Sequence, residues 1–187
     1  MGFTRAELES HLGETVDDLL GPETKLLFVG INPGLWTAAT QTHFAHPGNR
    51  FYPALFRAGI IGREIDRGTG MTEEDRAHLL GRGIGITNVV HRATARASEL
   101  TRAELVEGGA LLRGFVGQHR PAVVAVAGVT AYRTAFGDAK AVMGERSEGF
   151  EGSRLWIVPN PSGLNAHETV DSLADWYAQP ARAAGVI

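Results

Sequence analysis

The sequence predicts a three-layer α/β/α protein with a central, mainly parallel sheet of four strands. Four short apolar runs, at 25–30, 85–90, 122–127 and 155–158, alternate with stretches of helical spacing. Strands that alternate with helices in this way form parallel sheets with helices on both faces. We find no internal repeat or linker, and we therefore expect a single domain over residues 1–187.

The first run, 25–30, is typical of a parallel strand that is buried on both faces, because its apolar residues follow one another without alternation. Asn32-Pro33-Gly34 ends this strand. Pro33 lacks a backbone donor and biases Asn32 toward an extended conformation. Asn32 is therefore expected at the carboxyl edge of the sheet, where open α/β sheets bind their ligands.

Helix starts are predicted from capping boxes, in which a Thr is followed three residues later by Glu. Thr4 begins the helix of an acidic N-terminal extension over residues 1–24, which is expected to be broken or ended near Gly13 or Gly21-Pro22, and Thr101 begins a later helix. Residues 35–50 have little periodicity and are predicted to form a long, functional loop. Asn165, with Glu168 three residues on, is predicted to cap the last helix. The remaining helices are expected over 51–58, from 72 to about 81, and over 130–136.

Composition excludes several classes of protein. The chain has no cysteine, which excludes disulfides, thiolate metal sites and cysteine nucleophiles. There is no long apolar run and no basic leader, so we expect a soluble, cytoplasmic protein without membrane contact. The formal charge is -3, but residues 1–25 hold six acidic and two basic residues, so the remainder is slightly positive. This balance allows a weak local basic surface and argues against strong, nonspecific binding of DNA by a highly basic surface.

Common catalytic motifs are also absent from the sequence. No phosphate-binding loop is present, and the Gly-rich stretch 81–85 precedes a strand instead of following one. Ser162 lacks the preceding glycine of a nucleophile elbow. His43 and His46 are spaced to bind a metal, but no nearby carboxylate completes a ligand set. We therefore expect neither a metal nor an organic cofactor.

Four motifs occur in the order found in a known family. They are Gly-Ile-Asn-Pro-Gly at 30–34, Phe-Ala-His-Pro-Gly-Asn-Arg-Phe at 44–51, Gly-Ile-Thr-Asn-Val-Val at 85–90 and Asn-Pro-Ser-Gly-Leu at 160–164. In these motifs the chain resembles the mismatch-specific uracil/thymine DNA glycosylases, the Mug/TDG branch of the uracil-DNA glycosylase superfamily, from about residue 25 to 178. The resemblance implies the uracil-DNA glycosylase fold, a monomer, and a double-stranded DNA substrate that contains uracil or a mismatched or damaged base.

The resemblance implies that Asn32 is the catalytic residue, and the chemistry agrees. A glycosylase flips its nucleotide out of the duplex and lets the base depart as an anion, so electrostatic stabilisation can carry most of the catalysis. The amide oxygen of Asn32 could accept a hydrogen bond from the attacking water and orient it. Because the amide does not ionise, it cannot be a general base, and we expect a slow enzyme that favours good leaving groups.

The base pocket is expected to include six residues. Gly34 stands where the uracil-only branch has a Tyr, so the pocket should admit bulkier bases such as thymine opposite guanine or etheno-cytosine. Phe44 is expected to stack on the flipped base, or else to be a core aromatic. Asn160 is expected to contact the pyrimidine or the abasic sugar phosphate, or else to be a turn residue before Pro161. The full set is Gly30, Ile31, Gly34, Phe44, Asn88 and Asn160.

The stretch after the last strand is expected to contact DNA through Gly163, Leu164, Asn165 and His167. Leu164 resembles the wedge that fills the gap left by the flipped nucleotide, and the alternative is a hydrophobic staple before an Asn165 cap. Relatives have Ser-Arg or Ala-Arg after the wedge, so here Asn165 or His167 would read the orphan guanine, or Asn165 would only cap the helix. Candidate phosphate contacts, or else solvated surface residues, are Arg50, Arg92 and Arg96.

The sequence as a whole indicates a monofunctional base-excision glycosylase, a hydrolase that leaves an abasic site in damaged DNA. An alternative is a non-catalytic DNA lesion or mismatch binder on the same fold, since fold alone does not separate the two. A small-molecule nucleosidase is a third reading, and it would not need Leu164 on an exposed loop.

Overall fold

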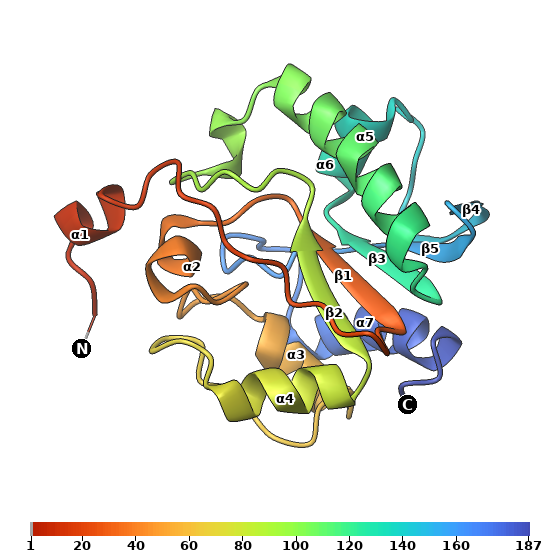
Figure 1. Cartoon of the computed structure of the whole chain (residues 1–187), viewed down its shortest axis with the longest axis horizontal. Coiled ribbons are helices and arrows are strands. Elements are labelled where there is room, and N and C mark those ends of the chain that lie inside the picture. Colours follow the sequence, from red (N-terminus) through yellow and green to blue (C-terminus); the bar gives the residue numbers. More distant parts are fainter. Residues whose placement is uncertain (1) are drawn as a thin grey trace.

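The computed structural model describes residues 2–187 and contains a five-stranded sheet between two layers of helices (Figure 1). The strand order is β2 (Ile84–Asn88), β1 (Leu26–Gly30), β3 (Val123–Ala127), β5 (Ser153–Val158) and β4 (Gly144–Phe150). The first four of these strands run parallel, and β4 is antiparallel to β5. The α/β/α class is confirmed, and the sheet has one strand more than the four that were predicted.

The additional strand, β4, is polar and lies at the edge of the sheet. It has the sequence Gly-Glu-Arg-Ser-Glu-Gly-Phe, and most of its side chains are partly or fully exposed. Glu145 forms an ion pair at 2.8 Å with Arg154 of β5, and the Arg154 guanidinium lies over the ring of Trp156. A charged edge strand resists pairing with other chains, but it has no apolar run by which a sequence search would find it.

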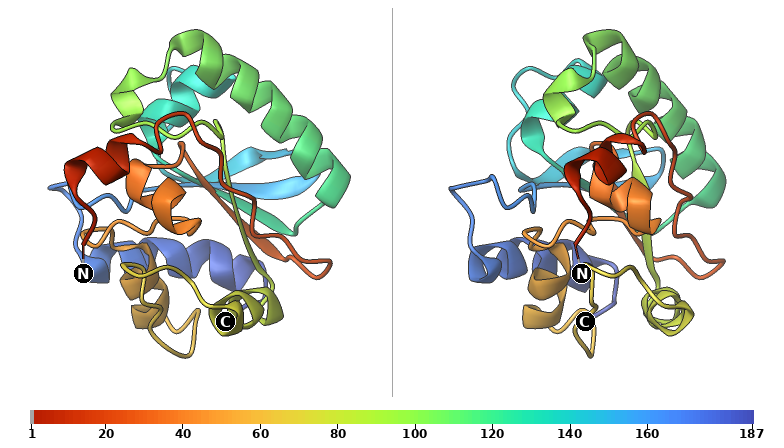
Figure 2. Two further views of the ribbon diagram at one scale, coloured as in Figure 1. Left: turned by 60° about the vertical axis from the view of Figure 1, so that its left-hand side comes forward. Right: turned by 90° about the vertical axis from the view of Figure 1, so that its left-hand side faces the viewer.

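The two faces of the sheet bury alternate residues of each strand. On β1, Leu26 and Phe28 face α3 (Phe51–Arg57), α4 (Glu73–Gly81) and α7 (Val170–Ala183). Leu27 and Val29 face α5 (Arg102–His119) and α6 (Val129–Phe136) on the other side (Figure 2). Gly30 and Asn88 are paired in register at the ends of β1 and β2, and by this alternation both belong to the face of α3 and α7.

Capping signals placed most helix starts correctly. The boxes at Thr4, Thr72 and Thr101 are all formed, with the Thr side chain accepting from the backbone N–H three residues on. The prediction for the last helix was wrong, because Thr169 and not Asn165 caps α7, with its side chain accepting from Ser172. Two capping signals compete four residues apart, and the side-chain hydrogen bonds of Asn165 are made within its own loop.

The predicted N-terminal helix begins at Thr4 as expected but is short, since the segment is helical only over α1 (Arg5–Glu9) and not through to residue 24. Gly13 has φ +84°, a left-handed conformation that ends helical structure. The chain then runs extended along β2, where Leu19 and Ile86 exchange backbone hydrogen bonds of 2.9 and 2.8 Å (Figure 1). The unpaired edge of β2 offers backbone partners that a surface helix would leave unsatisfied.

The predicted loop at 35–50 contains a short helix, α2 (Leu35–Thr40), and is irregular only after it. Gly34 precedes α2 and accepts from Ala38 N–H at 3.0 Å, and Thr37 and Ala38 are buried. A 3₁₀ turn, η1 (Ala97–Glu99), lies between β2 and α5. Within residues 2–187, no helix combines the length and the apolar composition that a membrane span requires.

Candidate active site

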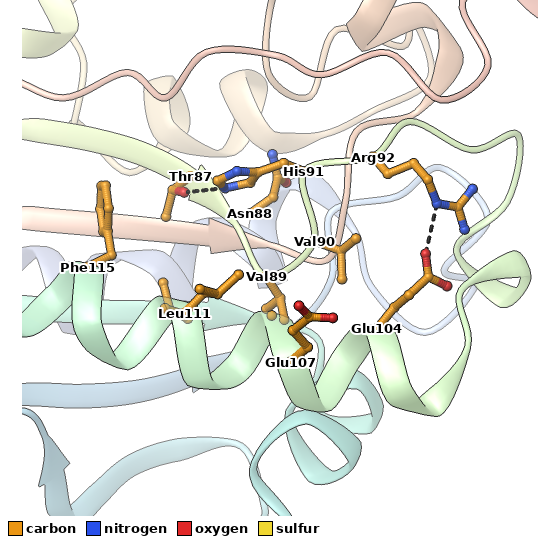
Figure 3. Close-up of a pocket in the computed structure, with 12 residues that line it drawn as sticks. Thr87, Asn88, Val89, Val90, His91, Arg92, Glu104, Glu107, Leu111 and Phe115 are labelled. Carbon is orange, nitrogen blue, oxygen red and sulfur yellow. Dashed lines mark hydrogen bonds and ion pairs between the residues drawn. The ribbon is translucent and has the colours of Figure 1, made fainter.

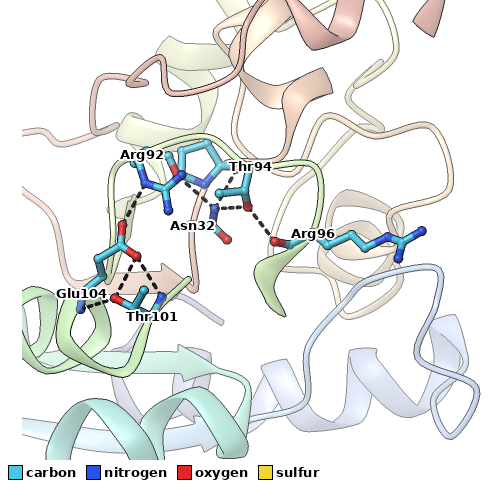
Figure 4. A network of polar contacts seen from close by, with 7 residues as sticks. Asn32, Arg92, Thr94, Arg96, Thr101 and Glu104 are labelled. Atoms are coloured by element: carbon cyan, nitrogen blue, oxygen red, sulfur yellow. Dashed lines mark hydrogen bonds and ion pairs between the residues drawn. The ribbon is translucent and has the colours of Figure 1, made fainter. Parts of the chain in front are cut away.

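The side chain of Asn32 is held by three oxygen atoms. Its Nδ2 donates to the carbonyl oxygen of Arg92 at 3.0 Å and to Thr94 Oγ1 at 2.8 Å, and lies 3.1 Å from the carbonyl oxygen of Pro33 (Figure 4). Carbonyl oxygens only accept, so the amide must present its nitrogen to them. The opposite atom, Oδ1, has no hydrogen-bond partner among residues 2–187 and points away from this network. Asn32 therefore offers a fixed acceptor at the carboxyl edge of β1.

The loop that holds Asn32 is fixed on two sides. On one side the loop is bonded along the Asn32-Pro33 turn. Val90 N–H donates to the Ile31 carbonyl at 2.9 Å, and Thr94 N–H donates to the Pro33 carbonyl at 3.1 Å. On the other side the N-terminal segment contacts Ala93. Gly13 N–H donates to the Ala93 carbonyl at 3.0 Å, and Ala93 N–H donates to the Glu14 carbonyl at 2.8 Å. The N-terminal extension is thus a support of the loop that orients Asn32.

Gly30, Phe44 and Asn88 meet at the end of β1. A Cβ atom at Gly30 would lie 2.5 Å from Asn88 Oδ1 and 3.2 Å from the Phe44 ring. Any larger residue at position 30 would push both side chains away, so glycine is required for this close approach. The structure therefore brings together three of the predicted base-pocket residues.

Phe44 packs against the core with one face of its ring, as its alternative reading predicted, and its stacking on a flipped base stays a prediction. One face of its ring stacks on Phe51, with centroids 4.2 Å apart, but the side chain is only partly buried. Its φ of +56° is a left-handed conformation that is costly for an aromatic residue. The loop is held in place by buried Tyr52, whose hydroxyl donates to the His43 carbonyl at 2.8 Å. Backbone strain that persists at a partly exposed aromatic residue is typical of functional sites.

The other predicted pocket residues lie further apart. A Cβ at Gly34 would meet no atom within 4 Å, so the space beside it is open. Asn160 uses its Oδ1 to accept from Ser162 N–H at 2.9 Å, which is the turn role predicted as its alternative. Asn160 and Ile31 line a hollow of about 420 Å³ together with Gly128.

Leu164 lies at the tip of the loop after β5 and is 92% exposed. The loop touches the stretch that follows Phe44, because a Cβ at Gly163 would lie 2.6 Å from the carbonyl oxygen of Gly48. Gly163 is therefore required for the contact between two loops. The staple reading of Leu164 was wrong, since it needed a cap at Asn165 and the cap is Thr169.

Arg50 holds this loop in place. Its guanidinium donates to the carbonyl oxygens of Gly163 at 3.0 Å, Asn165 at 3.1 Å and Glu168, and its backbone N–H donates to the Pro161 carbonyl at 2.9 Å. Arg50 therefore clamps the two loops together, and the phosphate contact predicted for it stays a prediction. Sequence reasoning missed this role because the partners are backbone atoms more than a hundred residues away.

Asn165 and His167 differ in their surroundings. Asn165 Nδ2 donates to the Asn160 carbonyl at 3.0 Å, and Asn165 Oδ1 accepts from His167 N–H at 3.2 Å, so both amide atoms act within the loop. The side chain of His167 is exposed and makes no hydrogen bond to any of residues 2–187. Of the two residues predicted to read the opposite strand, only His167 has its polar atoms open to solvent.

The arginines after β2 also differ from each other. Arg92 Nε lies 2.8 Å from Glu104 Oε1, and Glu104 in turn accepts from Thr101 N–H at 2.8 Å in the capping box. The hydrogen bond from Arg92, followed by that from the Thr101 backbone, lowers the pKa of Glu104 to about 2. Arg92 is thus paired internally. Arg96 is exposed and forms no ion pair within residues 2–187, so it suits a phosphate contact better.

A separate groove of about 470 Å³ lies between the end of β2 and α5 (Figure 3). It is bordered by Asn88, Arg92 and Glu107, with Leu111 and Phe115 on its apolar side. It does not include Asn32 or Phe44, so we do not assign it to the active site.

His43 and His46, which are spaced to bind a metal, do not form a metal site with each other. Both ring nitrogens of His43 are within hydrogen-bond distance of protein partners, and His46 Nδ1 accepts from Gly48 N–H at 3.0 Å. Over residues 2–187 no group of three or more His, Cys, Asp or Glu residues is arranged to hold a metal ion.

Sequence reasoning missed Thr94, His43 and the support from residues 13–19. The only signal for Thr94 was the polar end of its strand region. No local signal identified the other two, because their partners are distant along the chain.

Comparison with known proteins agrees with this architecture. The model of the family described as the uracil DNA glycosylase superfamily matches residues 18–182. The fold is similar to the solution NMR structure of a protein from Methanosarcina acetivorans described as a proposed uracil DNA glycosylase. That match has a TM-score of 0.63 and 17% sequence identity, and it covers 92% of this chain and 98% of the other.

Proposed function

Because this chain belongs to the uracil DNA glycosylase superfamily, we propose that it is a monofunctional DNA N-glycosylase that removes uracil from duplex DNA and leaves an abasic site. The observation that carries this proposal is the fixed amide of Asn32. Three oxygens hold its nitrogen, and its oxygen is left to accept a hydrogen bond. Hydrolysis needs a water aimed at the sugar carbon, and a pre-oriented acceptor supplies that aim without reorganising in the transition state.

In this mechanism the flipped base lies against Phe44, with its polar edge toward Asn88. The bond between sugar and base breaks as positive charge develops on the sugar and negative charge on the base. Asn32 accepts a hydrogen bond from the attacking water but does not take its proton, since an amide is not a base at neutral pH. The water oxygen bonds to the sugar carbon, and its proton passes to solvent or to the departed base anion. Without a general base the enzyme loses roughly 100- to 10,000-fold in rate, which favours substrates whose base leaves readily.

The substrate range that we propose follows from the open space at Gly34. No atom lies within 4 Å of the position that its Cβ would occupy, so a methyl group at pyrimidine C5 would meet no wall there. This supports membership of the mismatch-specific Mug/TDG branch, with thymine opposite guanine and etheno-cytosine as sterically acceptable bases besides uracil.

We propose that the loop that carries Leu164 binds the DNA. A side chain that is 92% exposed on a braced loop is suited to enter the base stack, and the Arg50 clamp keeps it from folding away. His167, on the same loop, would contact the orphan guanine, and Arg96 would contact a phosphate.

The test is single-turnover cleavage of labelled oligonucleotides that carry uracil opposite guanine, uracil opposite adenine, or uracil in a single strand. We expect cleavage to be strongest opposite guanine and to fall by at least about 100-fold in Asn32→Ala, the scale for loss of a transition-state electrostatic group. Gln118→Ala, on the exposed surface of α5, is the matched control and should cleave like the wild type.

Two outcomes would contradict the proposal. Undiminished cleavage by Asn32→Ala would move the catalysis to another residue. Specific binding of mismatched duplexes without any abasic product would identify a lesion-binding protein instead.

A further inference from the structure

His43 connects the N-terminal segment to Asn88. The imidazole is only 4% exposed, and its Nε2 lies 2.9 Å from the carbonyl oxygen of Asp17. Its Nδ1 lies 3.2 Å from Nδ2 of Asn88, which is itself only 5% exposed. Three residues from distant parts of the sequence thus form one buried chain of hydrogen bonds.

The direction of this chain follows from the chemistry of its ends. The Asp17 carbonyl can only accept, so His43 Nε2 carries the proton. In a neutral imidazole the other nitrogen, Nδ1, is then an acceptor, and Asn88 must present its NH₂ group to it. Burial lowers the pKa of His43, which favours this neutral form. The amide orientation of Asn88 is therefore set by a carbonyl group on the N-terminal segment.

The oxygen of Asn88 is consequently turned toward Gly30 and Phe44. Oδ1 lies 2.5 Å from the Cβ position of Gly30, and the Phe44 ring lies 3.2 Å from the same point. A base that stacks on Phe44 would meet a hydrogen-bond acceptor at this edge and not a donor.

We propose that His43 is a positioning residue that fixes the acceptor of Asn88 toward the base and thereby selects bases with an N–H donor at that edge. This inference rests on the proposed function, because it requires a flipped base beside Phe44. Uracil and thymine carry such a donor at N3. Etheno-cytosine does not, because its N3 is closed into the added ring, so it would leave a nearly buried oxygen unpaired. We expect the pocket to disfavour it by on the order of 10- to 100-fold.

The experiment compares single-turnover cleavage of uracil and of etheno-cytosine, each opposite guanine, by the wild type, His43→Leu and His43→Asn. In His43→Leu the Asn88 amide can rotate, so the preference for uracil over etheno-cytosine should fall by about tenfold. In His43→Asn the new Oδ1 takes the place of Nδ1 and should restore the wild-type preference. A purely structural role would lower both rates together and leave their ratio unchanged, and that result would overturn the inference.

A second measurement does not depend on activity. Nitrogen NMR of wild-type protein labelled at its histidine rings should show one imidazole that carries its proton on Nε2 and that disappears in His43→Asn. A proton on Nδ1 of His43 would overturn the inference even if the variants proved unstable. Absence of uracil cleavage by the wild type would instead refute the proposed function, and the NMR result would still decide how His43 is bonded.

Discussion

The amide nitrogen of Asn32 lies 2.8 Å from the hydroxyl oxygen of Thr94, and this hydroxyl donates its own proton to the Arg96 carbonyl, also at 2.8 Å. Since the hydroxyl has only one proton, Thr94 can only accept from Asn32. The direction of the Asn32 amide is therefore determined by the backbone of the loop after β2.

Thr94→Val tests this relationship, because it keeps the shape of the side chain and removes the acceptor. We expect the single-turnover rate on uracil opposite guanine to fall about fivefold, the value of one hydrogen bond of roughly 1 kcal/mol, with unchanged affinity for DNA. The control is Thr134→Val on α6, whose hydroxyl bonds only within its own helix. A wild-type rate in Thr94→Val would show that the amide is fixed without it.

Arg50 and Arg96 can be separated by the salt dependence of DNA binding. Replacing a phosphate contact lowers the slope of log affinity against log salt by about one, whereas breaking a clamp between loops does not. We expect Arg96→Gln to lower the slope. Arg50→Gln should weaken binding at every salt concentration without changing the slope, because the Arg50 guanidinium already donates to carbonyl oxygens of the loop that carries Leu164. A lower slope in Arg50→Gln would show that Arg50 does contact a phosphate.

Leu164→Ala should reduce cleavage of duplex substrates on the order of tenfold or more, because the unstacked step is no longer filled. Cleavage of a single-stranded substrate, which needs no wedge, should change little. The melting temperature should also stay constant, since the side chain is 92% exposed. Leu111→Ala, at a residue that is 69% exposed on α5, is the control for loss of surface leucine. Full duplex activity of Leu164→Ala would favour a nucleosidase.

Gly34→Tyr tests whether the open space decides the choice of base. The backbone at Gly34 is extended, with φ -79°, and a side chain there would meet no neighbour, so we expect the variant to fold. Cleavage of thymine opposite guanine should be lost while cleavage of uracil is kept, because the ring would occupy the space beside C5. Equal loss on both bases would show that position 34 does not discriminate at C5.

The stability of the folded protein should decrease as the pH falls, as a consequence of His43. Burial lowers its folded-state pKa below 6.5; Asp17 and Asp18 oppose the shift, and Arg76 and His91 add to it. Below pH 6.5 the unfolded chain binds a proton that the folded chain does not, so the stabilisation is complete above that pH and decreases as pH falls. Urea midpoints at about pH 7.5 and about pH 5.5 should differ more for the wild type than for His43→Asn. Equal differences would assign the pH dependence to other groups.

Several features followed from local sequence. The buried strands were found because apolar runs between turn residues can hardly form anything else in a sheet covered on both faces. The helix starts at Thr4 and Thr101 were found because a capping box is complete within four residues. Asn32 was placed at the sheet edge because Pro33 ends the strand wherever the rest of the chain goes.

The tertiary structure decided what the sequence left open. Thr94 lies 62 residues from Asn32, Arg50 lies 113 residues from Gly163, and His43 lies 26 residues from Asp17, so none of these pairs leaves a local pattern. Strand β4 and the extended N-terminal segment were missed because their own residues do not favour strands. They are extended because they pair with an edge of the sheet. By itself, the sequence determined the elements and the position of the catalytic candidate. The direction of each polar side chain in the site depends on backbone groups that only folding brings together.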